Sequence, residues 1–418
     1  MIATVVTPVG DWSLWGLMAS YLPVLVAAWA ATLVATPIIR SIAIATNVVD
    51  RPDDARKLHS RPIAYLGGIA VFVGLIVGIA VSYTIDSPIS FRPVPMSVVV
   101  AMMAVTATGF IDDVWGLDPW FKTVGLLVAA GLMSLYGGIG TQTAAAFLAY
   151  FTGNGQIGFD LSIAGAVWYV NITEWVGVGL VAVFVLGGCN ASNLIDGLDG
   201  LLSGTTMIIA GGLLMISLLM TLHLTTASLG QIESTLSQHI LESEGITLAG
   251  ARTSLCMAVI GATLAFLVYN FNPAQIFLGD TGSLLLGYTC VTIVLMLGEM
   301  GQTHFVLAGL IVFGLPIVDT VLAIFRRKVQ GLPASSPDAN HLHHILKRSL
   351  GTVKLAVIGM WSIEAVLASI GVALAALSLT HELRVMGIYL VFIMIFGGVA
   401  IAGTVMGRRA MKARQSGS

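Results

Sequence analysis

The sequence predicts an all-α polytopic membrane protein. Of its 418 residues, 57% are apolar and only 10% are charged, and 47 are glycine. This composition is far from that of a soluble domain. A helix needs about 20 mostly apolar residues to cross a hydrocarbon core about 30 Å thick, and runs of that length recur along the chain. Basic residues gather in alternate loops, which is typical of a chain that crosses a membrane repeatedly.

About eleven apolar runs are long enough to be transmembrane helices. The first run lacks the preceding basic residues of a signal peptide, so we expect it to remain as a permanent helix. The three cysteines lie within or beside apolar runs and indicate neither a disulfide framework nor a thiolate metal site. In chain order, the expected spans cover residues 15–39, 66–85, 94–111, 120–137, 175–191, 199–221, 251–270, 282–299, 304–325, 354–378 and 385–406.

The distribution of Lys and Arg predicts the topology. These residues gather in 40–65, at Lys122, in 326–354 and in the tail that starts at Arg408. The positive-inside rule places this face in the cytoplasm, with the N-terminus outside and the C-terminus inside. We expect one integral-membrane domain over 1–418. Its cytoplasmic loops would cover 40–65, 112–119, 192–198, 271–281 and 326–353, and its long outer segments 138–174 and 222–250.

Aspartates collect on the predicted cytoplasmic face, where every acidic residue is Asp rather than Glu. They occur in GFIDDVWGLD (109–118), NASNLIDGLDGLL (190–202) and NPAQIFLGDTGSLLLG (272–287). Each stretch alone is also explained as a capped interfacial turn. Several carboxylates at one face repel one another unless a cation such as Mg²⁺ lies between them, and Mg²⁺ commonly binds carboxylates together with substrate phosphates. The pattern therefore points to a nucleotide or pyrophosphate substrate at the cytosolic membrane face, beside helix N-termini that bind anions.

One carboxyl lies inside an apolar run. Glu364 is alone in the tenth run, where an ionisable side chain is costly and is often functional. We favour a packed or protonated carboxyl between helices over a functional role.

The stretch PDANHLHHIL (337–346) places three histidines in four positions. A zinc site is disfavoured because the sequence contains no HExxH pattern and no nearby cysteine. Ser336 is a candidate N-cap and Pro337 a candidate first helical residue, so the histidines would occupy the first turns of a short helix. In such a helix His341 and His344 share a face and the middle histidine points away. The imidazoles could meet a phosphate there, although a solvated basic loop explains the spacing equally well.

Six stretches together carry a family resemblance. They are RKLHSRPIAYLGG (56–68), GFIDDVWGLD, NASNLIDGLDGLL, FLGDTGS (277–283), LPIVDT (315–320) and SPDANHLHH (336–344). In their order and sidedness, the chain resembles the polyprenyl-phosphate N-acetylhexosamine-1-phosphate transferases. This family includes enzymes that start O-antigen, enterobacterial common antigen and teichoic acid synthesis, and is related to phospho-MurNAc-pentapeptide translocase.

The resemblance implies a Mg²⁺-dependent glycosyl-1-phosphate transferase, with Mn²⁺ as an alternative ion. Undecaprenyl phosphate would attack the β-phosphate of a UDP-amino sugar and release UMP. The protein would be a multi-pass protein of the bacterial cytoplasmic (inner) membrane. UDP-GlcNAc is the first donor choice, and UDP-FucNAc or UDP-QuiNAc the second. Its expected partners include the lipid bilayer but not nucleic acid. A homodimer is possible as well as a monomer.

The same resemblance implies roles for individual residues. Asp280 and Asn193 correspond to metal ligands, and Asp112 and Asp113 to a catalytic pair. Asp196 corresponds to a catalytic residue beside the nucleotide. The implied substrate contacts are Asp199 and Phe277 to uracil, Lys57, Lys122, Arg326 and Arg327 to phosphates, and His341, His343 and His344 to sugar and pyrophosphate.

Rival interpretations explain less of the sequence. Translocases of the MurNAc branch usually have three consecutive histidines, which this chain lacks, and Ala64, Gln275 and Ala339 depart from common family residues. CDP-alcohol phosphotransferases match Asp196, Asp199 and Gly200 but not the residues that follow. A secondary transporter would place ionisable groups near the midplane and often shows inverted repeats, whereas here the charge lies at one interface.

Overall fold

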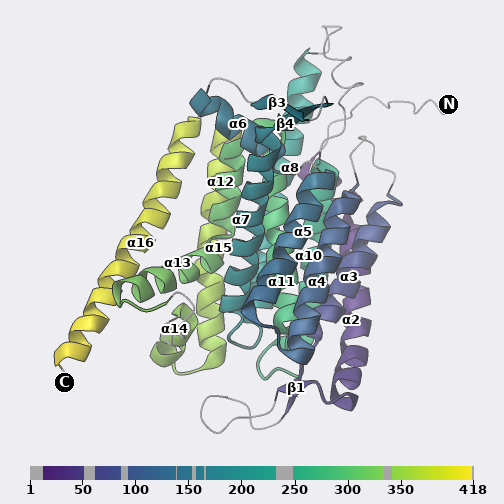
Figure 1. The fold of residues 1–418 in the computed structure, drawn as a ribbon. Helices are drawn as coiled ribbons and strands as arrows, with labels where there is room; N and C mark the ends of the chain where they lie inside the picture. Colours follow the sequence, from purple (N-terminus) through teal and green to yellow (C-terminus); the bar gives the residue numbers. More distant parts are fainter. Residues whose placement is uncertain are drawn as a thin grey trace.

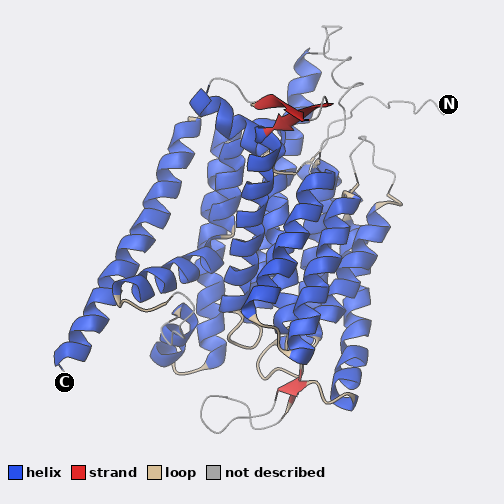
Figure 2. Cartoon of the chain, in the orientation of Figure 1, coloured by secondary structure: helices blue, strands red, loops and turns tan. Residues whose placement is uncertain are grey.

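The computed structural model describes residues 13–50, 62–85, 93–137, 139–152, 157–163, 166–231, 248–333 and 341–416. Helices make up most of the described chain (Figure 1, Figure 2). They are α1 (Leu14–Ser20), α2 (Leu22–Ala45), α3 (Gly67–Ser82), α4 (Met96–Trp115), α5 (Pro119–Gly137), α6 (Thr141–Thr152), α7 (Ile172–Ile195), α8 (Leu201–Gln231), α10 (Ala249–Asn270), α11 (Gly279–Met296), the 3₁₀ turn η1 (Glu299–Gly301), α12 (Thr303–Val312), α13 (Gly314–Val329), α14 (Leu342–Leu350), α15 (Val353–Leu379) and α16 (Val385–Ser416).

The helices fit a polytopic membrane protein. Eight of the described helices are long and apolar enough to cross a membrane, namely α2, α4, α7, α8, α10, α11, α15 and α16. The pair α12 and α13 would make a ninth span, bent by 78° at the break between them. Two shorter apolar helices, α3 and α5, occupy the expected spans 66–85 and 120–137. The all-α membrane architecture is therefore supported, whereas the count of eleven spans and the sidedness stay predictions.

Two short β-hairpins lie at opposite ends of the helix bundle (Figure 1). At one end β1 (Val49–Asp50) pairs antiparallel with β2 (Ile63–Ala64). This end also carries α14, and we call it the site end. At the other, the outer end, β3 (Gly158–Ile163) pairs antiparallel with β4 (Ala166–Asn171).

Backbone bonds join the segment before α3 to the segment before α11. Ala64 forms a parallel bridge with Ile276, and the N–H of Phe277 donates to the Ala64 carbonyl at 2.9 Å. In return, the N–H groups of Gly67 and Gly68 donate at 2.9 Å to the carbonyls of Phe277 and Leu278. The two helices therefore start side by side at the site end.

Helix α11 is the centre of the packing. It has no distinctly polar face, as expected for a helix surrounded by others, and every residue from Thr281 to Met296 is buried. Glycines let its neighbours approach closely: a Cβ on Gly68 of α3 would lie 2.1 Å from the Gly282 nitrogen, and one on Gly109 of α4 would lie 2.5 Å from the Thr281 Cα. The start of α11 is consequently held in a fixed position against α3 and α4.

The carboxyl of Glu364 agrees with the sequence interpretation, and the three cysteines lie in the protein interior. Cys189, Cys256 and Cys290 are all buried and free. Glu364 of α15 is fully buried, and its Oε2 accepts the N–H of Leu315 at 3.0 Å. Leu315 lies in the first turn of α13, where helix N–H groups have no carbonyl partner of their own. The packed carboxyl that we expected is thus a cap for α13.

Candidate active site

Asp113 lies near the end of α4, rather than in the loop predicted to begin at residue 112, and reaches the start of α11. Its Oδ1 accepts the N–H of Asp280 at 2.7 Å, and its Oδ2 accepts the N–H and the hydroxyl of Thr281 at 2.9 and 2.5 Å. Gly279, at φ +69°, precedes them, and a Cβ there would lie 2.5 Å from Asp113 Oδ2. Because a helix N-terminus carries unpaired donors and partial positive charge, Asp113 caps α11 and positions Asp280.

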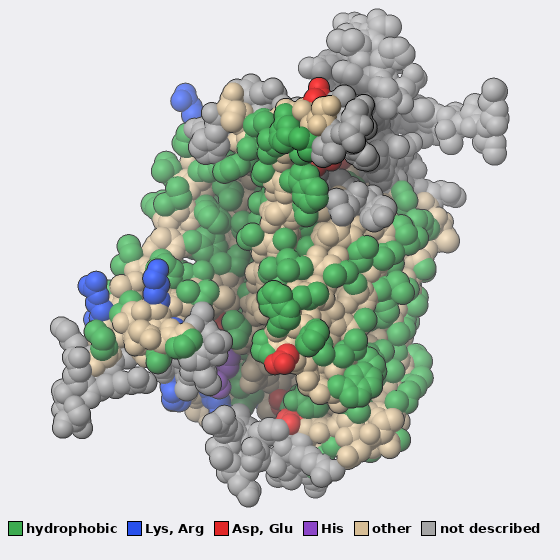
Figure 3. All heavy atoms as spheres, viewed as in Figure 1, with side chains coloured by type: hydrophobic (Ala, Val, Ile, Leu, Met, Phe, Trp, Pro, Cys, Tyr) green, Lys and Arg blue, Asp and Glu red, His purple; other side chains and the backbone are tan. Residues whose placement is uncertain are grey.

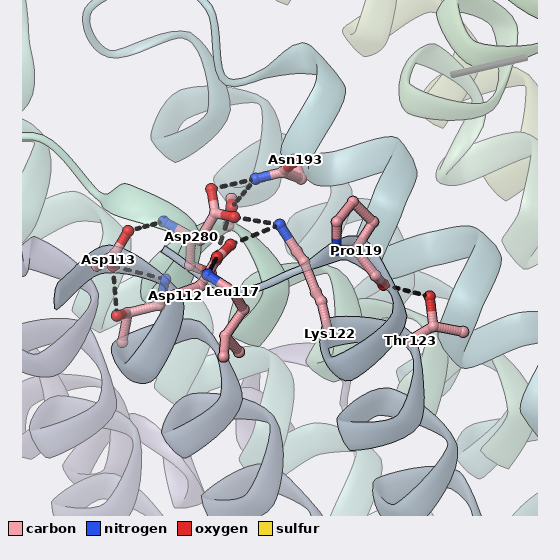
Figure 4. Close-up of polar contacts among 10 residues, drawn as sticks. Asp112, Asp113, Leu117, Pro119, Lys122, Thr123, Asn193 and Asp280 are labelled. Carbon is pink, nitrogen blue, oxygen red and sulfur yellow. Dashed lines mark hydrogen bonds and ion pairs between the residues drawn. The ribbon is translucent and has the colours of Figure 1, made fainter. Parts of the chain in front are cut away.

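Lys122 of α5 stands between two carboxylates from other helices (Figure 4). Its Nζ donates to Asp112 Oδ2 at 3.2 Å and forms an ion pair with Asp280 Oδ2. On the far side, Asn193 of α7 donates from Nδ2 to Asp280 Oδ1 at 2.7 Å. Four helices therefore contribute one connected cluster, which we call the Lys122 cluster (Asp112, Lys122, Asn193 and Asp280). An ammonium group held this way can exchange a carboxylate partner for a phosphate oxygen.

Asp196 directly follows α7 and lies among other carboxylates. Desolvation raises the pKa of Asp196 to about 8, and the charges of Asp280, Asp113 and Asp199 add to the rise. A carboxyl with such a pKa is mostly protonated near pH 7 and can donate a hydrogen bond. Carboxyls with pKa values perturbed in this way gather at functional sites.

Tyr65 is a site residue that was not predicted from the sequence. Its ring packs edge-on against Phe277, with ring centroids 6.0 Å apart. Burial raises the pKa of its hydroxyl to about 12, and nearby carboxylates raise it further. These carboxylates are Asp50, Asp113, Asp280 and Asp196. Tyr65 therefore links the aromatic pair to the acidic centre of the site.

Asp199 holds the turn that precedes Phe277. Its Oδ2 accepts the side-chain amide of Asn272 at 2.8 Å and the N–H of Ala274 at 3.1 Å. The buried Asn270 ties the same turn to the loop after Asp196, because its side-chain oxygen accepts the N–H of Gly200 at 3.2 Å. The expected uracil residues Asp199 and Phe277 are thus brought into one substructure.

The histidine stretch folds differently from our expectation. Helix α14 begins at Leu342, so His341 is its N-cap residue, and the proposed cap Ser336 lies outside the described residues together with Pro337. Since His341 precedes the helix, helical spacing does not apply to it. The rings of His341 and His343 stack at 5.7 Å with planes 10° apart, and both residues are buried. The predicted pairing of His341 with His344 on one face is therefore wrong; His344 is only half-buried.

His343 lies against the loop that follows Asp196. A Cβ on Gly197 would lie 2.5 Å from His343 Nε2, so any other residue at 197 would force the ring to move. Burial lowers the pKa of His343 to about 4, and the charge of His344 lowers it further. His343 is accordingly a neutral packing residue near pH 7, and its contact joins α14 to the loop between α7 and α8.

The basic residues predicted to bind phosphates have different environments. Arg326 and Arg327, in the last turn of α13, are both buried. Lys57 lies outside the described residues. On the face drawn in Figure 3, hydrophobic side chains form a belt, and acidic and histidine side chains lie close together toward the site end. Lys122 is therefore the predicted phosphate ligand that the described structure places directly beside the carboxylates.

The Lys122 cluster offers the oxygen ligands that Mg²⁺ prefers. Asp112 and Asp280 supply carboxylates and Asn193 supplies an amide. Ser283, which lies next to the cluster, adds a hydroxyl 2.9 Å from Asn193 Nδ2. Within the described residues no group of three or more His, Cys, Asp or Glu side chains has the geometry of a metal cage. Because Mg²⁺ commonly uses one or two carboxylates and takes its other ligands from phosphates and water, this donor set fits that ion.

Comparison with known proteins adds to this geometry. Residues 95–298 match the model of glycosyl transferase family 4, a range that includes the whole Lys122 cluster. The chain is 29% identical over 369 residues to the probable undecaprenyl-phosphate N-acetylglucosaminyl 1-phosphate transferase of Bacillus subtilis, with 88% of each chain covered. It is 31% identical to the decaprenyl-phosphate N-acetylglucosaminephosphotransferase of Mycolicibacterium smegmatis, over 75% of this chain and 72% of that protein. The chain belongs to glycosyl transferase family 4.

A third relative represents the other branch of the resemblance. The chain is 28% identical to the phospho-N-acetylmuramoyl-pentapeptide-transferase of Bacillus anthracis, over 80% of this chain and 90% of that protein. The predicted family is therefore confirmed. The matched range ends before Asp319 and the histidines, whereas the 369 residues aligned with the Bacillus subtilis protein include them.

Proposed function

We propose that this family 4 protein transfers GlcNAc-1-phosphate from UDP-GlcNAc to undecaprenyl phosphate and releases UMP. The observation that carries the proposal is the position of Lys122 between Asp112 and Asp280 at the mouth of α11. Phosphoryl transfer depends mainly on positioning and on neutralising charge, and this cluster supplies both. Relatives named for transfer to undecaprenyl and decaprenyl phosphates support the choice of acceptor.

The reaction forms one P–O bond and breaks another. An oxygen of undecaprenyl phosphate bonds to the β-phosphorus of the donor, and the bond from that phosphorus to the oxygen bridging to the α-phosphorus breaks. A phosphate monoester has its second pKa near about 6, so the nucleophile is already largely ionised. Asp112 then needs only to hold Lys122 in place, and Asp113 holds the start of α11.

We assign Mg²⁺ to Asp280 and Asn193, with Mn²⁺ as an alternative. When bound there, the ion would neutralise the donor diphosphate. Lys122, displaced from Asp280 toward a phosphate oxygen, would neutralise the remaining charge. Chelation with EDTA should abolish turnover, and added Mg²⁺ should restore it.

The uridine end of the donor would bind against the aromatic pair Tyr65 and Phe277. Phe277 and Tyr65 supply the faces on which uracil would stack. The bonds to Asp199 found in the described chain go to Oδ2, which leaves Oδ1 for a uracil N–H. Asp196, with its raised pKa, would donate a hydrogen bond to the diphosphate.

The basic face supports an orientation in which the site end lies in the bacterial cytoplasm. A C-terminal fusion to green fluorescent protein should then fluoresce, whereas a C-terminal fusion to alkaline phosphatase should be inactive. The reverse result would contradict the proposed sidedness without bearing on the reaction.

A donor panel tests the proposed reaction. Purified protein receives undecaprenyl phosphate, Mg²⁺ and either UDP-GlcNAc, UDP-FucNAc, UDP-QuiNAc or UDP-MurNAc-pentapeptide, and both UMP and the lipid-linked sugar are measured. We expect UDP-GlcNAc to be turned over fastest. Asp280→Ala should remove activity, whereas Asp160→Ala, which changes an exposed aspartate at the outer end, should leave it unchanged. Absence of both products with every donor would rule out the reaction.

A further inference from the structure

Asp319 of α13 holds the start of α14 with both of its oxygens. Its Oδ2 lies 2.7 Å from His341 Nδ1, and its Oδ1 accepts the N–H of Leu342 at 2.8 Å. Asp319 is 1% exposed and His341 is 6% exposed, so water competes little for these bonds. Neither Asp319 nor this pairing was among the site residues expected from the sequence.

The bond to Leu342 makes Asp319 the cap of α14. The N-cap residue His341 makes no side-chain capping bond of its own to this helix. The first N–H groups of a helix need acceptors, and a carboxylate is a favourable one because of the positive helix end. Asp319 therefore fixes the position of α14 as well as the plane of the His341 ring.

The bond to His341 decides which ring nitrogen is available. A carboxylate accepts, so Nδ1 must carry a proton and donate to Asp319. Nε2 is then the nitrogen left for another partner. His341 also stacks on His343, which packs against Gly197 in the loop after Asp196. The ring is consequently part of the same substructure as the site carboxylates.

We propose that Asp319 is a positioning residue that fixes His341 Nδ1 as a donor and directs Nε2 to the diphosphate of the sugar nucleotide. This inference rests on the proposed function. Both the carboxylate and a phosphate oxygen are acceptors, so the ring between them carries a proton on each nitrogen. The resulting carboxylate–imidazolium–phosphate chain contains two charge-assisted hydrogen bonds.

Replacing Asp319 with Asn tests the charge while keeping the shape. In Asp319→Asn the amide oxygen can still accept the Leu342 N–H, but the amide NH₂ faces Nδ1, which becomes an acceptor. A neutral ring with its proton on Nε2 then replaces the imidazolium. We expect kcat/KM for UDP-GlcNAc to fall by roughly 10-fold to 100-fold, the range typical when a residue that orients a functional histidine is removed.

A double-mutant cycle separates positioning from a purely structural role. His341→Asn alone should cost at least as much activity as Asp319→Asn alone. If Asp319 acts through His341, adding Asp319→Asn to His341→Asn should cause no further loss. Losses that multiply in the double variant, or an Asp319→Asn variant with wild-type kcat/KM, would overturn the proposal. Asp319→Glu, which keeps the charge but moves it by one methylene, provides a second cycle if the Asn variant does not fold.

Glu299 offers a matched control at the outer end. Like Asp319, it accepts one backbone N–H, that of Leu248 at 2.8 Å, and binds one basic side chain, that of Arg252 at 2.9 Å. Glu299→Gln should lower the thermal unfolding midpoint without changing kcat/KM or its dependence on His341. If wild-type protein turns over no donor, the proposed function fails; if it turns over UDP-GlcNAc but the cycle is additive, only the role of Asp319 fails.

Discussion

Lys122 illustrates how much a single side chain contributes at this site. Its ammonium is the cation that the described structure places between the carboxylates of Asp112 and Asp280. Two carboxylates brought this close repel each other unless a positive group separates them. The same ammonium can stabilise charge that develops on a transferring phosphoryl group.

Lys122→Met keeps the length of the side chain and removes its charge. We expect kcat to fall by roughly 100-fold or more, because one charge-stabilising donor is typically worth 10²–10³ in rate. Steady-state kinetics with UDP-GlcNAc measures the effect. Lys354→Met removes the same charge from an exposed position at the start of α15 and should be neutral. A Lys122→Met enzyme within about threefold of wild type would contradict this role.

At the scale of elements, the break between α12 and α13 turns the chain toward the site. The two helices meet at 78°, and α13 carries Asp319 to His341. Glu364 of the neighbouring α15 accepts the Leu315 N–H at the start of α13. A buried carboxyl that costs free energy within the membrane thus has a structural reason.

Two substitutions of Glu364 distinguish its role as a hydrogen-bond acceptor from the space that its side chain fills. Glu364→Leu leaves the buried Leu315 N–H without a partner and should lower the free energy of unfolding by about 1–3 kcal/mol. Glu364→Gln keeps an acceptor oxygen and should remain close to wild type. Thermal unfolding in detergent measures both variants. Equal stability of the Leu and Gln variants would show that the hydrogen bond contributes nothing.

The docking of α14 should depend on pH through His343. Its pKa is about 4 in the folded protein, below the unfolded value of about 6.5, so the unfolded chain binds the proton more readily. Stability is therefore unaffected above pH 6.5 and falls as the pH drops from 6.5 to 4. The shift corresponds to a loss of about 3 kcal/mol.

Hydrogen exchange of the α14 amides at pH 7.5, 6.5, 5.5 and 4.5, corrected for the intrinsic exchange rate, measures this effect. Wild-type protection should fall across the acidic range, while His343→Gln, which cannot gain the proton, should show a flatter dependence. A His343→Gln variant with the wild-type pH dependence would assign the loss to other groups.

For the whole molecule, the outer end contains buried contacts that hold helices together, whereas the site end contains the groups proposed to act on the substrate. Arg252 of α10 is fully buried there, with Nη1 2.9 Å from both the Met296 carbonyl and Glu299 Oε2. A buried ion pair of this kind adds little net stability, but removing one partner leaves an uncompensated charge.

Arg252→Met should therefore destabilise the protein by about 3–5 kcal/mol, and the double variant with Glu299→Gln should recover part of that loss. KM and kcat per folded molecule should remain at wild-type values, because the site lies at the other end. Thermal unfolding and kinetics on the same preparations measure the two properties. A changed KM for UDP-GlcNAc would show that the two ends are coupled.

The site was predictable from the sequence only in part. Its aspartates and histidines stand in short motifs, so Asp112, Asp280 and the HLHH stretch were found by local pattern. Tyr65, Asp319 and the packing role of Gly197 were missed, since each depends on a neighbour from another segment. The start of α14 was placed too early because the cap of that helix comes from α13 and not from the residues before it.

The sequence by itself determined the membrane-embedded helical architecture and the family, because hydropathy and motifs are local properties of the chain. Only the tertiary structure decided which donors meet which acceptors. At the start of α11, Lys122 meets Asp280 from 158 positions away in the sequence, and Asp113 meets Asp280 from 167 positions away. Such pairs depend on how helices pack, and that packing depends on close glycine contacts and capped helix ends across the whole bundle.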